Sequence, residues 1–202
     1  MIVGITGGYC SGKSVASGVL RGLGYEIVEV DRIGHEALEA KMGELVSVFG
    51  ETVLNGGERR SPDRSDPAGR SVDRGKLGGI VFGDPAARKK LEAIVHPWMI
   101  RRVKEMIRGK GKVVIDAALL IEMCLFTLCD AVLGIEVSEE TAVRRGMERG
   151  GLTREQVLLR IRAQIPLKQK MQYVDKIIGN DGDIGAFEKK VREFADSAEK
   201  KV

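Results

Sequence analysis

The sequence of 202 residues is poor in the residues that mark several protein classes. It has three cysteines, Cys10, Cys124 and Cys129, and no Cys-x-x-Cys pair. Neither a disulfide framework nor a zinc site is therefore indicated. Cys124 and Cys129 stand in an apolar stretch, which predicts that both serve as small core residues. The net charge is only +4, which is too mild by itself to indicate a nucleic-acid partner, although it suits a protein that binds polyanionic small molecules.

Long hydrophobic runs are also missing. No apolar stretch approaches the roughly 20 residues that cross a bilayer, so we expect no contact with a membrane. The apolar share of 43% and the charged share of 31% are ordinary for a globular protein. A functional motif begins as early as Gly7, which leaves no room for a signal peptide. We therefore expect a soluble, cytoplasmic protein.

The most informative segment that is present is Gly7–Ser14, which matches Gly-x4-Gly-Lys-Ser at every fixed position. It follows an apolar run and precedes a helical pattern, the context in which backbone N–H groups surround a phosphate. We expect Lys13 to reach the β- and γ-phosphates of a nucleotide and the Ser14 hydroxyl to bind Mg²⁺. The candidate nucleotide-binding residues of this phosphate loop are Gly8, Cys10, Ser11, Gly12, Lys13, Ser14 and Val15.

Apolar runs alternate with helical patterns along the chain, which is typical of a parallel sheet with crossover helices. We therefore expect an α/β fold with a five-stranded parallel sheet flanked by helices. The expected strands are Ile2–Thr6, Glu26–Val30, Lys112–Ile115, Asp130–Val137 and Lys176–Gly179.

Local signals predict where several helices begin or end. Asp84 stands directly before Pro85, which predicts a helix start. Apolar positions over 184–198 recur with a helical period. His96 precedes Pro97, and because the residue before proline disfavours the helical region, we expect a break between two helices there.

The segment Asn55–Gly75 differs from the rest in composition. It contains five arginines, four glycines and two prolines, and almost nothing apolar. Because it can bury little surface, we expect a long, mobile surface loop. Its arginines would also suit a phosphate-binding lid, and the sequence leaves this alternative open.

Carboxylates follow two of the expected strands. Asp31 ends the second strand, 18 residues after Lys13, and the carboxyl ends of parallel strands line one crevice. Asp31 can therefore orient or deprotonate an attacking hydroxyl, and it can also cap the helix that follows. Asp116 ends the third strand and is a candidate Mg²⁺ ligand through water.

Six arginines crowd into 19 residues near the end of the chain: Arg144, Arg145, Arg149, Arg154, Arg160 and Arg162. Arg145 and Arg149 are four residues apart, so they share one helix face. A lid over ATP needs such cations to neutralise the transferring phosphoryl group, although a solvated basic face would look the same. Thr153 and Gln156 have capping-box spacing for a helix over 154–164.

Further matches extend over nearly the whole chain. In order, the matching segments are 6–8 with 11–14, Asp31, 76–82, 91–97, 119–122, 145–149, 160–164, Lys170 and 175–182. Together they resemble the dephospho-coenzyme A kinase family. The resemblance implies transfer of the ATP γ-phosphate to the ribose 3′-hydroxyl of dephospho-coenzyme A, the last step of coenzyme A biosynthesis.

The resemblance also implies roles for individual residues. Asp31 would be the base, with Lys13 and Arg145 as further catalytic residues. Arg149 would bind ATP as a second lid cation, and Asn180 and Gly182 would lie near the adenine. The acceptor side would involve, besides Asp31, the residues His96, Leu119, Leu120 and Glu122, although core packing also accounts for the two leucines.

The architecture that the resemblance implies is a single P-loop kinase domain. Its core would cover 1–31, 109–143 and 173–202, with a helical acceptor-binding part over 32–108 and a small lid over 144–172. ATP and Mg²⁺ would be the cofactors, and ATP and dephospho-coenzyme A the small-molecule partners. We expect a monomer or a weak homo-oligomer.

Three departures from the family pattern and two rival functions stay open. Cys10 replaces a usual glycine, Glu29 a frequent aspartate, and the segment from Arg59 to Arg74 is longer than usual. Another P-loop kinase, acting on a nucleoside, a nucleotide or a shikimate-like alcohol, would share the phosphate chemistry. A GTP-dependent switch would need an Asn-Lys-x-Asp motif, and the sequence has none.

Overall fold

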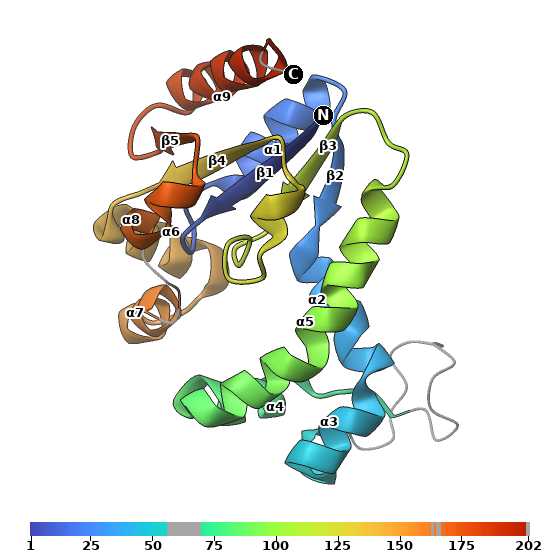
Figure 1. Ribbon diagram of the computed structural model, residues 1–202. Helices are drawn as coiled ribbons and strands as arrows, with labels where there is room; N and C mark the ends of the chain where they lie inside the picture. Colours follow the sequence, from blue (N-terminus) through green and yellow to red (C-terminus); the bar gives the residue numbers. More distant parts are fainter. Residues whose placement is uncertain (56–69, 163, 165–166, 201–202) are drawn as a thin grey trace. The chain divides into compact units, whose positions relative to one another are not determined.

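A five-stranded parallel sheet forms the framework of the computed structural model, which describes residues 1–55, 70–162, 164 and 167–200 (Figure 1). The strand order is β2-β3-β1-β4-β5. The sheet confirms the predicted α/β fold, and each predicted strand is present with its ends shifted by no more than one residue. The strands are β1 Ile2–Gly7, β2 Glu26–Glu29, β3 Val113–Asp116, β4 Ala131–Glu136 and β5 Lys176–Gly179.

The register of the strands places the chemistry at one edge of the sheet. Ile5 of β1 pairs with Asp116 of β3, and Asp116 pairs with Glu29 of β2. Gly7, at the end of β1, pairs with Ile135 of β4. Because all strands run the same way, the chain leaves β1, β2 and β3 at the same edge, where ligands bind in open α/β sheets.

The described chain divides into two compact units, Met1–Asp31 with Met106–Val202 and Arg32–Glu105. The first unit contains the sheet and a core in which α1 and α9 pack on each other and on the strands. Its helices are α1 Lys13–Gly22, α6 Glu139–Gly150, α7 Arg154–Arg162, α8 Leu167–Lys170 and α9 Ile184–Glu199, with the short 3-10 helices η2 Leu125–Leu128 and η3 Met171–Tyr173.

The second unit is helical and has a hydrophobic cluster of its own. That cluster contains Leu45, Val53, Leu54, Val72, Leu77, Val81 and Ala87. Its elements are most of α2 Val30–Ala40, α3 Met42–Phe49, the 3-10 helix η1 Glu51–Val53, α4 Arg74–Gly83 and most of α5 Pro85–Ile107.

Side-chain caps confirm two predicted helix starts. The Asp84 carboxylate accepts a hydrogen bond from the Ala86 N–H at 2.8 Å, at the start of α5. At the start of α7, the Gln156 N–H donates to the Thr153 hydroxyl, and the Thr153 N–H donates to Gln156 Oε1. Each cap satisfies N–H groups that have no partner within the helix.

The predicted break at His96 and Pro97 is wrong. Helix α5 continues through Pro97. Proline removes one backbone hydrogen bond and crowds the preceding turn, but Val95 and Met99 on either side of it are buried. Their burial favours one continuous helix over two separate segments, so tertiary packing overrides the local preference.

The predicted surface loop is wrong at its C-terminal end. Val72 is buried and pairs with Leu54 in an isolated antiparallel bridge. Asp73 then caps α4 by accepting hydrogen bonds from the N–H groups of Gly75 and Lys76. The apolar side chain of Val72 and the capping aspartate were the signals for this structure. The remainder of the prediction, over 56–69, lies outside the described residues.

The two cysteines predicted in the core differ from each other. Cys124 is exposed, so this prediction is wrong; it adopts the left-handed conformation that precedes η2. Cys129 is half-buried, and the absence of a side chain at Gly4 leaves room for its Sγ. Burial, together with the charge of Asp130, raises the pKa of Cys129 to about 12.

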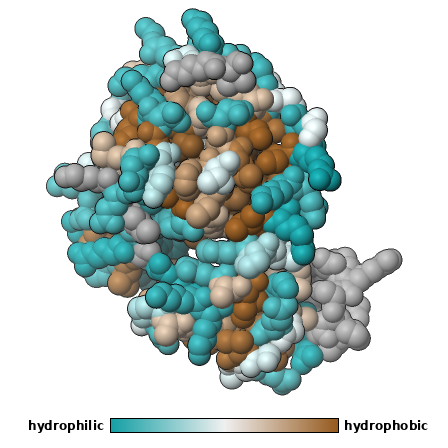
Figure 2. All heavy atoms as spheres, in the orientation of Figure 1, coloured by the Kyte–Doolittle hydropathy of each residue, from teal (hydrophilic) through white to brown (hydrophobic). Residues whose placement is uncertain are grey.

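On the face of the molecule turned to the viewer in Figure 2, hydrophobic residues gather over the strands and the segment that follows β3, with hydrophilic residues around them. No helix in the described part of the chain is long and apolar enough to span a membrane.

Candidate active site

The phosphate loop leaves β1 through a tight turn. The Ser11 N–H donates to the Gly8 carbonyl at 3.2 Å, which closes the turn. A side chain at Gly7 would lie 2.6 Å from the Ile135 carbonyl oxygen, so the close approach of β4 requires glycine at this position. Gly12 has a φ of 101° and immediately precedes α1. The glycines at both ends of the loop are thus required by its geometry.

Cys10 occupies the third position of this turn with a φ of 56°. A Cβ in this left-handed region meets the neighbouring backbone at a cost of roughly 1–2 kcal/mol. Glycine would adopt the same conformation without that cost. The loop therefore tolerates the departure at Cys10 with local backbone strain and keeps the turn.

Two of the predicted nucleotide-binding side chains stand in the first turn of α1. Lys13 is half-buried and Ser14 is exposed. The N-terminus of the helix concentrates unpaired N–H groups and positive partial charge at this place, which favours an anion. Lys13 and Ser14 are therefore available to a bound phosphate and its metal ion.

Asp116 ends β3 in a partly buried position among charged groups. Burial is the largest cause that raises the pKa of Asp116, and the negative charges of Asp31 and Glu29 add to it. The positive charge of Lys13 and a 2.7 Å hydrogen bond from the Ser17 hydroxyl oppose that rise. The phosphate-loop lysine and the carboxylates predicted from separate strands therefore interact electrostatically in the folded chain.

Asp31 is exposed in the first turn of α2. The helix begins at Val30, whereas a cap at Asp31 would require it to begin at Arg32, so the predicted capping role of Asp31 is wrong. Its place in the first turn still lets the helix dipole stabilise the carboxylate. The side chain is accessible to a second substrate, as a base for an acceptor hydroxyl has to be.

The oxygen donors at this edge fit a magnesium ion. Mg²⁺ usually takes one or two protein oxygens and completes its coordination with water and substrate phosphates. The Ser14 hydroxyl and one Asp116 oxygen, the other being bound by Ser17, match this need. Among the described residues no group of three or more His, Cys, Asp or Glu could hold a metal, so substrate oxygens would have to complete the coordination.

Arg145 extends from α6 to the phosphate loop. Its Nη2 donates to the Asn180 carbonyl at 2.8 Å, and its Nη1 lies 3.5 Å from the Cys10 carbonyl oxygen. Arg149 is exposed one turn further along the same helix. The guanidinium of Arg145 is thus held beside the loop by backbone oxygens. Hydrogen bonds lower the pKa of Asp181, and the positive charge of Arg145 adds to this effect.

Comparison with known proteins identifies the family. A family model described as dephospho-CoA kinase matches residues 1–186. The dephospho-CoA kinase of Geobacter sulfurreducens is 37% identical over 202 residues, covering 96% of this chain and 96% of that protein. The chain belongs to the dephospho-CoA kinase family.

Two solved structures resemble this chain over nearly its whole length, and one of them is named as a dephospho-CoA kinase. A crystal structure of a Thermus thermophilus protein is 34% identical with a TM-score of 0.78, covering 98% of this chain and 97% of that one. The dephospho-CoA kinase from Campylobacter jejuni is 25% identical with a TM-score of 0.66, covering 96% and 95%. The family resemblance predicted from the sequence is therefore confirmed, and it favours a dephospho-CoA kinase over the rival P-loop kinases and over a GTP-dependent switch.

The residues that the resemblance assigned to the acceptor side occupy different environments. His96 is half-buried on α5 in the helical unit. Leu119 is half-buried, whereas Leu120 is fully buried and packs where Gly4 lacks a side chain. Leu120 is therefore a core residue and can influence the acceptor only through packing.

Glu122 has a partner that the sequence did not reveal. The Lys170 ammonium lies 2.8 Å from Glu122 Oε1, and the two side chains are only 4% and 16% exposed. Lys170 also donates to the Ala118 carbonyl at 3.3 Å. The pair links α8 to the segment that follows Asp116. The sequence placed Lys170 among the matching residues but gave no signal of its partner.

A second missed residue is Ser17, whose hydroxyl orients Asp116. Ser17 stands four residues after Lys13 on α1, so the helical period was the available signal. Gly182 is exposed in the turn after β5, and Asn180 in the same turn is buried. Asn180 contacts the loop backbone, as described below.

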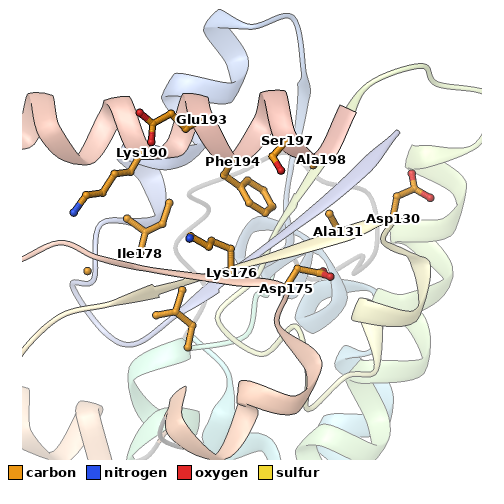
Figure 3. Close-up of a pocket in the computed structure, with 12 residues that line it drawn as sticks. Asp130, Ala131, Asp175, Lys176, Ile178, Lys190, Glu193, Phe194, Ser197 and Ala198 are labelled. Carbon is orange, nitrogen blue, oxygen red and sulfur yellow. The ribbon is translucent and has the colours of Figure 1, made fainter. Parts of the chain in front are cut away.

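A cavity of about 520 Å³ lies away from these residues, between β5 and α9 (Figure 3). Asp130 and Asp175 line it, but their carboxylates accept hydrogen bonds from the N–H groups of Ile2 and Val132 at the starts of strands. None of the predicted site residues lines this cavity. It therefore takes no part in the site at the carboxyl edge of the sheet.

Proposed function

We propose that this chain transfers the γ-phosphate of ATP to the ribose 3′-hydroxyl of dephospho-coenzyme A. Membership of the dephospho-CoA kinase family supports the reaction and the pair of substrates. The observation that carries the mechanism is the strand register, which places Asp116 at the carboxyl edge beside the ends of β1 and β2, within electrostatic range of Lys13 and Asp31. It unites a phosphate-binding lysine, a candidate metal ligand and a candidate base at one edge of the sheet.

The phosphate loop binds the nucleotide in this proposal. The N–H groups of the loop and of the first turn of α1 donate to the β- and γ-phosphates, and Lys13 neutralises part of their charge. Ser14 and Asp116 would hold Mg²⁺. The ion supplies charge neutralisation at the phosphate oxygens when it is bound.

Asp31 acts on the acceptor. Its exposed carboxylate accepts the proton of the attacking 3′-hydroxyl and aligns the hydroxyl oxygen with the γ-phosphorus. Phosphoryl transfer depends mainly on such positioning and on charge stabilisation. Arg145, held beside the loop, stabilises the negative charge of the transferring group, and Arg149 contributes a second cation.

In this proposal, different parts of the chain bind the two substrates. The core over 1–31, 109–143 and 173–202 binds ATP, and the helical part over 32–108 binds dephospho-coenzyme A with His96. Residues 144–172 form the lid that carries Arg145 and Arg149. Leu119 and Glu122 line the acceptor side, Leu120 supports them from the core, and Gly182 lies near the adenine. We propose a monomer or a weak homo-oligomer in the cytoplasm.

The direct test is ADP release from ATP with a panel of acceptors, comparing wild type with Asp31→Asn. Dephospho-coenzyme A should stimulate ADP release by the wild type. The Asp31→Asn variant should lose about 10²-fold or more in kcat, the scale of general base catalysis. Its KM for ATP should change little, since Asp31 acts on the other substrate.

Asp196→Asn on the exposed side of α9 provides a control that also loses one carboxylate. If a nucleoside monophosphate stimulates ADP release and dephospho-coenzyme A does not, the proposed reaction is wrong. If the reaction proceeds but Asp31→Asn keeps a near-normal kcat, only the role of Asp31 is wrong.

A further inference from the structure

Asn180 lies against the phosphate loop rather than facing solvent. The residue follows β5, and its side chain is buried, with only 2% exposed. Its Nδ2 donates to the Ser11 carbonyl at 2.8 Å. A Cβ at Gly12 would collide with the same Nδ2. The amide of Asn180 therefore occupies the space that the glycine of the loop leaves free.

This hydrogen bond fixes the direction of one peptide plane. The carbonyl of Ser11 and the N–H of Gly12 belong to the same peptide bond, and in a trans peptide these two groups point in opposite directions. No peptide bond in the described chain is cis. When Asn180 holds the Ser11 oxygen on its own side, the Gly12 N–H has to point away from Asn180.

We propose that Asn180 is a positioning residue that orients the Gly12 N–H for binding the phosphates of ATP. The inference rests on the proposed function, because it concerns the phosphate-binding loop of that reaction. Asn180 need not touch the nucleotide in this role. It acts through the backbone of the loop, and it lowers the cost of arranging the loop when ATP binds.

Two backbone hydrogen bonds of Asn180 also hold the turn after β5 in place beside the phosphate loop. Its N–H donates to the Glu136 carbonyl at 2.9 Å, which continues the pairing of β5 with β4. Its carbonyl accepts from Arg145 Nη2. The next residue, Asp181, accepts hydrogen bonds from the N–H and hydroxyl of Ser138 at the start of α6. One short turn thus connects the sheet, the loop and the helix that carries Arg145.

The burial of Asn180 also distinguishes this role from reading of the adenine base. Its Nδ2 is already bound to Ser11, and its Oδ1 is buried without a donor among the described residues. Neither polar atom is presented to solvent where a base would bind. The side chain therefore supports the phosphate loop, whichever residues contact the adenine.

The test uses Asn180→Asp, which keeps the size of the side chain but replaces the donor with an oxygen. Asn180→Ala provides a second variant without a buried charge. Each full-length variant is assayed for ATP affinity by calorimetry without acceptor, and for competitive inhibition by inorganic tripolyphosphate. The ratio of kcat/KM for ATP over ITP reports reading of the base. Phe194→Leu in the core at α9 controls for loss of stability alone.

We expect both variants to lose about tenfold or more in affinity for ATP and for tripolyphosphate, with the ATP-over-ITP ratio unchanged. A change in that ratio with normal tripolyphosphate inhibition would overturn the proposal, because Asn180 would then read the base. Reduced thermal stability with normal ATP affinity, as expected for Phe194→Leu, would overturn it as well. Wild type that binds ATP but does not phosphorylate dephospho-coenzyme A would contradict only the proposed reaction.

Discussion

At the scale of single residues, Asp116 combines a stability cost with a proposed function. Because its pKa in the folded chain is raised, the folded state binds a proton more readily than the unfolded state does. The contribution of Asp116 to the free energy of unfolding therefore falls as the pH rises from the ordinary carboxylate pKa through the raised value. An ionised Asp116 therefore destabilises the fold at neutral pH. The same carboxylate stands at the proposed Mg²⁺ site, where its negative charge would bind the ion.

Asp116→Asn should raise the unfolding temperature of the ligand-free protein, because the amide avoids the cost of a buried charge and its oxygen can still accept from Ser17. Activity should fall. The Mg²⁺ concentration that gives the half-maximal rate should rise by about 10–100-fold. Thermal unfolding at pH 5 and pH 8 checks whether the ionised carboxylate destabilises the fold. If it does, the difference in unfolding temperature between variant and wild type should be larger at pH 8.

Asp196→Asn controls for the loss of a charge on the surface. It should change neither the unfolding temperature nor the Mg²⁺ concentration that gives the half-maximal rate. A lower unfolding temperature for Asp116→Asn at both pH values would mean that the attraction of Lys13 outweighs burial, contrary to the direction found for Asp116.

At the scale of elements, the buried pair of Lys170 and Glu122 ties α8 to the segment after β3. Both side chains are largely removed from water, so loss of one partner leaves a buried charge without compensation. Exposed ion pairs contribute little by comparison, typically under about 1 kcal/mol. This pair should therefore contribute more to the position of α8 than an exposed ion pair would.

Lys170→Met should lower the free energy of unfolding by about 3–5 kcal/mol, the scale for breaking a buried pair. Adding Glu122→Gln should recover part of the loss, because the unpaired charge is removed. Urea unfolding of both single variants and the double variant measures the coupling. Lys41→Met, which breaks a more exposed pair with Glu44, is the control. Additive effects of the two substitutions would show that the pair contributes no coupling.

At the scale of the whole molecule, the two units have separate hydrophobic clusters that share no residue. The phosphate loop belongs to the first unit and His96 to the second. A ligand that binds one unit should therefore protect that unit against local opening more than the other. The proposed division of ATP and acceptor between the units can be tested in this way.

Hydrogen exchange with ATP and Mg²⁺ should slow the amides of the phosphate loop and α1, by up to about 100-fold when the ligand is at 100 times its Kd. Dephospho-coenzyme A should slow amides of α4 and α5, together with those of 119–122, which are proposed to line the acceptor side. Mass spectrometry of proteolytic peptides measures both, and the C-terminal end of α9 serves as an internal control. Protection by dephospho-coenzyme A that is confined to the first unit would contradict the division.

The sheet, the phosphate loop and the family could be predicted from the sequence alone. Alternating strand and helix patterns are local and periodic, and the loop motif has fixed spacing, so both can be read without tertiary contacts. The capping residues Asp84 and Thr153 are equally local, and the structure confirms the helices that begin there. The proposed roles of Asp31, Arg145 and the acceptor-side residues stay predictions.

Features that depend on partners distant in the chain could be seen only in the folded structure. Helix α5 continues through Pro97 because buried neighbours on both sides outweigh a local preference. Cys124 is exposed although its surroundings are apolar, and Lys170 meets Glu122 across 48 residues. The hydrogen bond from Asn180 to Ser11 joins residues 169 positions apart. Such contacts have no local signature, because they arise only when the strands have aligned and the turn after β5 meets the phosphate loop.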